Sequence, residues 1–173
     1  MVNDESLSVP LARFLAVEVC PPAWRAYDLY LFRDETVVFY AGQSACAFER
    51  VWEHVRGGPR GHSTVGRFVL CNWPRSARFA IELWSSQATR FAGVRAAAAS
   101  PKEALDAAER QLIEEHAPCF NEALNRSPAP VPAVYVTPAA QIRHLRSYRR
   151  MLQEARFMAR RVMEPGAWDK TSS

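Results

Sequence analysis

The sequence predicts a mixed α/β protein of the α+β class, in which strand, strand, helix, strand and helix follow one another. Two observations predict this order. Runs rich in β-branched and aromatic residues recur at 27–33, 36–41 and 78–86, which is typical of strands. Capping residues and apolar faces mark the helices between and after them. With 173 residues and 49% hydrophobic content, the chain is long enough for one domain and a short appendage.

The first half of the chain carries a predicted hairpin. An apolar run at 11–20, followed by two prolines, is expected to form an N-terminal strand. Residues 27–33 and 36–41 are separated by two acidic residues, so we expect them to pair with each other. A helix should follow, with Ser44 as its N-cap and its end near Arg56, where two glycines and a proline stop it. Its apolar face is formed by Phe48, Trp52 and Val55.

The second half begins with a long loop region at 57–77, in which the run VGRFVLCNW is a candidate strand. The alternating run at 78–86 is expected to be the third strand of the core. A capping box from Ser100 to Glu103, with proline at the first helical position, opens a helix that ends near His116.

Three parts follow one another along the chain. Residues 1–125 are expected to form the domain, with its core at about 25–125, and 126–138 form a proline-rich linker. Residues 139–173 are a basic amphipathic helix, to about residue 163, and a tail. We expect no signal peptide and no membrane span, because the N-terminus is acidic and no apolar run reaches 18 residues. The four cysteines show no metal or disulfide spacing, which favours free thiols in a reducing cytoplasm.

Positive charge is concentrated in two segments. The whole chain has a formal net charge of +4, whereas residues 139–163 alone hold seven arginines and one acid. A second segment, from His54 to Ile81, holds five arginines and no acid. Arginine clusters of this kind suit a polyanion, although a chain with 20 arginines and 2 lysines also reflects a compositional bias. DNA and RNA are polyanions that would satisfy this pattern.

Six positions carry side chains that suit phosphodiester cleavage. They are Tyr30, Tyr40, Arg50, His54, Glu109 and Asn121. Such a set supplies a base, a cation for the phosphate and a carboxylate for a metal. Arg50 and His54 lie one helical turn apart on a face rotated away from the apolar residues, so a solvated surface pair is the competing interpretation. Glu109 lies beside the apolar face of its helix, so it needs a cation or hydrogen-bond partners, and a structural ion pair with an arginine is the alternative to a metal.

The order and spacing of these positions resemble the GIY-YIG nuclease family over about residues 25–125. The two tripeptides read Asp-Leu-Tyr and Tyr-Ala-Gly here, the second with Tyr40 and Gly42. Gln43 replaces the lysine usual in excision-repair members, and the histidine four residues after Arg50 is closer to restriction-type members. The resemblance implies a small three-stranded antiparallel sheet flanked by helices, to which an N-terminal strand and the C-terminal basic helix are added. It also implies a metal-dependent endonuclease that hydrolyses DNA phosphodiester bonds.

By the same resemblance each position has an expected role. Tyr30 is the first choice for the general base and Tyr40 the alternate, and Arg50 and the metal must favour the phenolate because a free phenol has a pKa near 10. Arg50 would bind the phosphate, and His54 would accept or relay the proton. Glu109 would hold Mg²⁺ or Mn²⁺. Asn121 would orient a tyrosine hydroxyl or tie a loop, and a helix-end cap is nearly as good an interpretation.

Nucleic-acid contacts are expected from eight further residues: Gly42, Gln43, Arg56, Arg60, Arg67, Arg143, Arg146 and Arg150. Glycine at the end of the second strand would let the chain turn sharply and let a phosphate approach the backbone. The competing functions are a catalytically silent nucleic-acid-binding module and a protein that docks a partner through its C-terminal helix. The sequence is compatible with a monomer or a homodimer.

Overall fold

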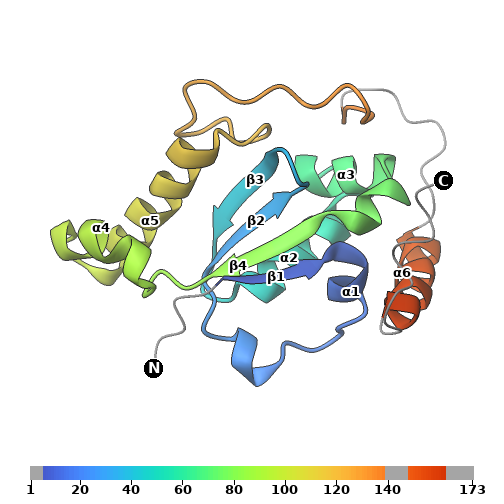
Figure 1. Cartoon of the computed structure of the whole chain (residues 1–173), viewed down its shortest axis with the longest axis horizontal. Coiled ribbons are helices and arrows are strands. Elements are labelled where there is room, and N and C mark those ends of the chain that lie inside the picture. Colours follow the sequence, from blue (N-terminus) through green and yellow to red (C-terminus); the bar gives the residue numbers. More distant parts are fainter. Residues whose placement is uncertain (1–5, 139–147, 163–173) are drawn as a thin grey trace.

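Within residues 6–138 and 148–162, which the computed structural model describes, four strands form one antiparallel sheet in the order β1-β4-β2-β3 (Figure 1). The strands are β1 (Leu7–Pro10), β2 (Leu29–Arg33), β3 (Val38–Gln43) and β4 (Ala80–Trp84). The predicted α+β class is therefore confirmed, with three core strands and an added N-terminal strand.

β2 and β3 form the predicted hairpin. Asp34 closes its turn, because the Oδ1 atom accepts the backbone N–H groups of Thr36 and Val37. In the ladder, Tyr30 lies opposite Gly42. β2 also pairs with β4, so both of its neighbours are strands.

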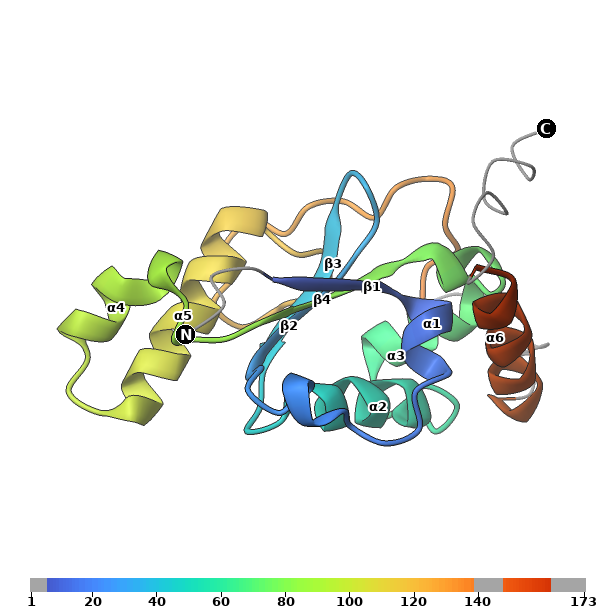
Figure 2. The ribbon, with the colours of Figure 1, turned by 60° about the horizontal axis from the view of Figure 1, so that its bottom comes forward.

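Helices cover both faces of the sheet (Figure 2). One face carries α1 (Leu11–Leu15), α2 (Ala47–Gly57) and α3 (Thr64–Cys71), and the other carries α4 (Ala92–Ala97) and α5 (Pro101–His116). Leu29 and Leu31 face α5, while Tyr30 and Phe32 face α2 and α3. All four side chains are buried, which explains why β2 is an unbroken apolar run rather than an alternating one.

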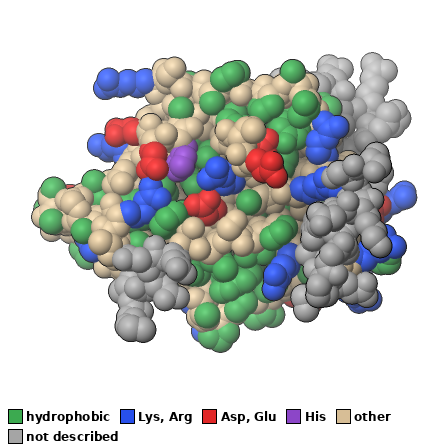
Figure 3. All heavy atoms as spheres, viewed as in Figure 1, with side chains coloured by type: hydrophobic (Ala, Val, Ile, Leu, Met, Phe, Trp, Pro, Cys, Tyr) green, Lys and Arg blue, Asp and Glu red, His purple; other side chains and the backbone are tan. Residues whose placement is uncertain are grey.

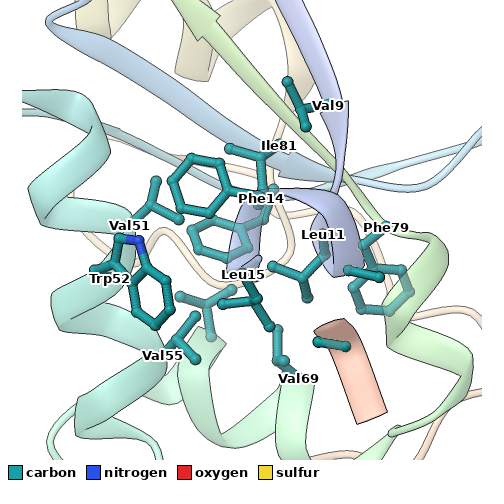
Figure 4. Packing of buried hydrophobic residues seen from close by; sticks show 14 of the residues in the cluster. Val9, Leu11, Phe14, Leu15, Val51, Trp52, Val55, Val69, Phe79 and Ile81 are labelled. Atoms are coloured by element: carbon teal, nitrogen blue, oxygen red, sulfur yellow. The ribbon is translucent and has the colours of Figure 1, made fainter. Parts of the chain in front are cut away.

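The larger of the two hydrophobic clusters lies between the sheet and α1 to α3 (Figure 4). Phe14 of α1 contacts the rings of Phe48 and Trp52 on α2. Val69 of α3 and Ile81 of β4 complete the packing in the same cluster. The cluster packs α2 against the sheet, and α2 carries two of the six predicted catalytic residues.

The N-terminal strand lies earlier in the chain than predicted. Residues 7–10 form β1 and pair with β4, whereas the predicted strand at 11–20 contains the helix α1. Leu11, Phe14 and Leu15 are fully buried, at a spacing that places them on one face of a helix. The run is apolar enough for a strand, but its periodicity is helical.

The region 57–77 contains the helix α3, not a loop or the candidate strand. Ser63 caps it by accepting the N–H of Gly66 at 3.0 Å. Gly66 packs against α2 so closely that a Cβ atom there would lie 1.8 Å from the carbonyl oxygen of His54. The predicted N-cap at Ser44 is also wrong: α2 begins at Ala47, and the Ser44 hydroxyl instead accepts the N–H of residue 46.

The proline-rich segment 126–138 has no regular secondary structure, yet it is bound to the core. The Tyr135 ring contacts those of Phe39, Phe68 and Phe79, and its hydroxyl donates to Asp34 at 2.7 Å. This contact joins the segment to the hairpin turn.

The C-terminal helix α6 (Tyr148–Val162) packs on α1 (Figure 1). Met151, Ala155 and Ala159 are buried in this contact, and Leu152 is partly buried. The predicted apolar stripe therefore packs on the domain core in its described part, while its first members, Ile142 and Leu145, lie outside the described residues. No helix among the described residues is long and apolar enough to span a bilayer.

Candidate catalytic site

Tyr30 is buried in the sheet, and its hydroxyl is bonded to a histidine. Its side chain is 1% exposed, and Oη lies 2.8 Å from Nε2 of His54. Across the ladder, a Cβ atom at Gly42 would lie 2.3 Å from the Tyr30 Oη. Gly42 is itself buried within β3, which continues to Gln43, so its absent side chain makes room for the tyrosine ring. The predicted sharp turn at Gly42 is not formed.

His54 is a buried residue, so the competing interpretation of a solvated surface pair is wrong for this histidine. It lies on α2 and is 9% exposed because α3 packs against this part of the helix. Nδ1 lies 2.8 Å from the Ser63 Oγ, so both ring nitrogens have partners. Ser63 was not among the predicted site residues, because its signal was the capping serine of a helix that was not predicted.

Burial sets the charge state of both residues. It lowers the pKa of His54 to about 4, and the nearby Arg50 guanidinium acts in the same direction. It also raises the pKa of Tyr30 well above its ordinary value, with Tyr40 adding to the rise and Arg50 opposing it. At neutral pH the protein therefore holds a neutral imidazole against a neutral phenol.

Tyr40 lies beside this pair and is half-buried. Its position on β3 is diagonal to Tyr30, on the same face of the sheet. The Tyr40 ring centroid is 6.2 Å from that of Tyr30 and 5.1 Å from that of His54. Burial raises the pKa of Tyr40, and the Glu109 carboxylate raises it further. The two tyrosines and the histidine thus form one aromatic group.

Arg50 is exposed, four residues before His54 on α2. Its side chain is 48% exposed, and Nη1 pairs with the Glu53 carboxylate at 2.6 Å. An exposed ion pair within one helical turn contributes little free energy, so a phosphate can compete for the guanidinium. The charge of Arg50 nevertheless lowers the pKa of Tyr30, Tyr40 and His54. Arg50 therefore lies close to these three residues.

Glu109 approaches the same site from α5. It is half-buried and accepts a hydrogen bond from Nε2 of Gln43 at 3.1 Å, and the same amide donates to Asp106 at 2.6 Å. The prediction that Glu109 lies beside the apolar face with a hydrogen-bond partner is confirmed. Asp106 was not among the predicted site residues, although its place about one helical turn before Glu109 could have identified it.

The two carboxylates suit a hard divalent cation. Burial raises the pKa of Glu109, with the Gln43 amide opposing the rise and the Asp106 charge adding to it. A cation between them would relieve this repulsion. Among the described residues, no group of three or more histidine, cysteine, aspartate or glutamate side chains gathers at one point. One or two carboxylates, completed by water and phosphate oxygens, are the usual protein ligands of Mg²⁺, so the donor set fits that ion.

Asn121 holds the outer edge of β3. Its Oδ1 accepts the N–H of Ala41 at 2.9 Å, and its Nδ2 donates to the Ala41 carbonyl at 2.8 Å. The N–H groups of Cys119 and Phe120 donate to carbonyls of the same strand. Of the expected roles of Asn121, the loop tie is therefore the one formed. Within the part of the chain that the structure describes, its amide bonds neither a tyrosine hydroxyl nor a helix end.

The expected nucleic-acid residues lie on several elements. Arg56 and Arg60 are exposed near the end of α2, and the Arg56 guanidinium lies over the Trp52 ring. The Nε atom of Arg67 on α3 is buried with no hydrogen-bond partner among the described residues. Arg150 on α6 is exposed and pairs with Glu154, while Arg143 and Arg146 lie outside the described residues.

On the face shown in Figure 3, acidic and basic side chains mix near the middle. Basic ones gather toward the end of the molecule where α6 lies. A surface hollow of about 790 Å³ lies elsewhere. It is formed between α5 and the loop at 122–127, and Tyr30, Arg50 and Glu109 are not among its lining residues. The aromatic group itself is closely packed, since Tyr30 is 1% and His54 9% exposed.

Comparison with known proteins yields no relative: no protein-family model, no curated protein and no solved structure matches the chain significantly. A functional assignment must therefore rest on the site itself.

Proposed function

We propose that this protein is a metal-dependent endonuclease that hydrolyses phosphodiester bonds in DNA. The observation that carries the proposal is the convergence of Tyr30, Tyr40 and His54 with the charges of Arg50 and Glu109 around the end of β3. A purely structural site has no need for a buried phenol–imidazole pair between an arginine and a half-buried carboxylate. Such groups provide a base, a phosphate-binding cation and a metal ligand.

Tyr30 acts as a base only in its phenolate form, which substrate binding can favour. A buried phenol is a weak base because burial opposes the phenolate. The Arg50 guanidinium already opposes this effect, and a cation at Glu109 would act in the same sense because Glu109 now raises the pKa of both tyrosines. We infer that Tyr30 becomes an effective base once the substrate and the metal are bound.

Arg50 would hold the phosphate. Its planar guanidinium can bind two non-bridging oxygens once it leaves Glu53. Glu109, assisted by Asp106, would hold Mg²⁺ or Mn²⁺. When bound, that ion supplies Lewis-acid stabilisation of the charge that develops on the phosphate and the leaving oxygen.

The exposed face of α6 supports nucleic acid as the substrate. Four arginines are exposed on this helix, whose buried residues Met151, Ala155 and Ala159 pack on the core: Arg149, Arg156, Arg160 and Arg161. A basic face on a docked helix suits the phosphate backbone of DNA, and RNA offers the same charge. We place the protein in the cytoplasm, where its four free thiols stay reduced, and expect a monomer or a homodimer.

A plasmid-nicking assay tests the proposal. Supercoiled plasmid should be converted to nicked or linear DNA by the wild-type chain in Mg²⁺ or Mn²⁺, and not after chelation by EDTA. A gel-shift experiment on the same DNA should show binding with and without metal. Binding without cleavage under any divalent metal would instead identify a silent nucleic-acid-binding module, and the absence of both would leave the partner-docking alternative.

A further inference from the structure

The hydrogen bonds of Ser63 determine which ring nitrogen of His54 carries a hydrogen. The Ser63 Oγ accepts the N–H of Gly66 at 3.0 Å and lies 2.8 Å from the His54 Nδ1. A helix N-terminus presents N–H groups and no acceptors, so the hydroxyl hydrogen cannot be used by the helix that Ser63 caps. Among the described residues, Nδ1 of His54 is the acceptor that this hydrogen reaches.

The opposite arrangement is disfavoured. If Nδ1 carried the hydrogen, the Ser63 Oγ would receive two donors, one from His54 and one from Gly66. Its own hydrogen would then have no acceptor among the described residues, although Ser63 and His54 are each only 9% exposed. A buried donor without a partner costs more free energy than its hydrogen bond would contribute.

We propose that Ser63 holds neutral His54 in the tautomer with its hydrogen on Nε2, so that His54 donates to the Tyr30 Oη. The 2.8 Å contact between Nε2 and Oη is then a bond in which the phenol oxygen accepts. Ser63 is a positioning residue, because it acts through His54.

This inference rests on the proposed function and assigns the roles within it. A donor on Oη remains bonded when Tyr30 has lost its proton to solvent, so it favours the phenolate, which then takes one proton from the attacking water. The other tautomer would accept the hydrogen of the phenol and stabilise the neutral form. His54 is therefore a hydrogen-bond donor to the base, and Tyr30 is the base.

One substitution reverses the direction of the two hydrogen bonds that link residue 63, His54 and Tyr30. In Ser63→Asp the carboxylate still caps α3 by accepting the N–H of Gly66. It has no hydrogen to give, so it requires the hydrogen of His54 on Nδ1, and Nε2 of the neutral ring then accepts from Tyr30. Ser63→Thr is the matched control, because it keeps both the cap and the hydroxyl hydrogen.

The tautomer is read directly by ¹⁵N NMR of histidine-labelled protein at pH 7. Substituting His62, His116 and His144 by glutamine leaves His54 as the one histidine signal. The wild-type and Ser63→Thr spectra should show a protonated Nε2 and a bare Nδ1, and the Ser63→Asp spectrum the reverse. A wild-type spectrum with the hydrogen on Nδ1 overturns the proposal, and this outcome is available even if Ser63→Asp does not fold.

Plasmid nicking then tests the link to catalysis. The cleavage rate of Ser63→Asp should fall about 10²-fold below that of the wild type, the usual size of a general-base contribution. The cleavage rate of Ser63→Thr should stay much closer to that of the wild type. Melting temperatures of the two variants separate this loss from instability. A Ser63→Asp protein that has switched tautomer and cleaves at the wild-type rate contradicts the assigned role of His54. If the wild type cleaves nothing, the proposed function fails, while the spectra still decide the tautomer.

Discussion

Tyr30 and Gly42 stand opposite each other in the β2–β3 ladder, and the Tyr30 ring occupies the space that any side chain at Gly42 would need. Gly42, the last residue of Tyr-Ala-Gly, thus leaves space for the ring of Tyr30, the last residue of Asp-Leu-Tyr. The pair makes the buried hydroxyl and its bond to His54 sterically possible.

Gly42→Ala should displace the Tyr30 ring. The added methyl would lie 2.3 Å from Oη and 2.5 Å from Cζ, so the ring or the strand must move. We expect a loss of about 1–3 kcal/mol in the free energy of unfolding, as for other overpacked cores, together with a large loss of cleavage. Urea denaturation measures the first and plasmid nicking the second. Gly93→Ala is the control, because a Cβ atom there meets nothing within 4 Å.

Glu109→Gln should abolish cleavage and leave DNA affinity unchanged or improved. Glutamine keeps the shape of the side chain and removes the charge that would hold the metal. Nicking in Mg²⁺ and a binding isotherm on the same DNA measure the two effects. Glu114→Gln, an exposed position on the same helix, should retain wild-type cleavage. Wild-type nicking by Glu109→Gln would show that this carboxylate is not a ligand.

Acidification should destabilise the fold through His54. The pKa of this histidine is about 4 in the folded protein and near 6.5 in the unfolded chain, so the unfolded state binds more protons between these values. The contribution of neutral His54 to the free energy of unfolding is complete above about pH 6.5 and is lost as the pH falls toward 4. It amounts to about 3 kcal/mol in total. The free energy of unfolding, measured by urea denaturation from pH 4 to 8, should rise more steeply with pH for the wild type than for His54→Gln. His62→Gln, at an exposed position, serves as the comparison. Equal slopes for the wild type and His54→Gln would contradict the buried neutral imidazole.

Asn121→Ala should loosen β3 at Ala41. The substitution removes two hydrogen bonds to a buried backbone unit and should cost about 1–3 kcal/mol in the free energy of unfolding. Cleavage should fall only in proportion to the loss of folded protein or of order at Tyr40. Thermal denaturation and nicking at a temperature where the variant is folded separate the two. A variant of normal stability that cannot cleave would give Asn121 a direct role instead.

The outer face of α6 should contribute to DNA affinity and to its salt dependence. Arg149, Arg160 and Arg161 are exposed and do not belong to the buried stripe, so replacing them by glutamine leaves the packing on α1 intact. For each phosphate that these arginines neutralise, the substitution should flatten the slope of log affinity against log salt by about 0.9 on duplex DNA. This triple substitution is sharper than deleting 139–173, which would also remove Met151 and Ala155 from the core. An unchanged slope would mean that these arginines only solubilise the helix.

Local signals predicted the parts of the structure that local chemistry decides. The hairpin follows from two β-rich runs and a short acidic turn, and α5 begins at its capping serine. The place of Glu109 beside an apolar face also follows from helical periodicity. What could not be predicted depends on contacts between distant segments.

His54 illustrates this limit. A helical wheel shows that it lies off the apolar face of α2, but the wheel cannot show that α3 folds back to cover it. The role of Gly42 likewise depends on the register between two strands, and that of Ser63 on a helix whose apolar residues were compatible with a strand.

The tie between Asn121 and Ala41 also bears on self-association. Unpaired strand edges are where β-sheets of different molecules join and aggregate. Residues 119–121 occupy the outer edge of β3, and β1 at the opposite edge is four residues long and ends in Pro10, which has no N–H to donate. The outer strand of the hairpin that carries both tyrosines is therefore shielded from intermolecular strand pairing along Val38–Ala41.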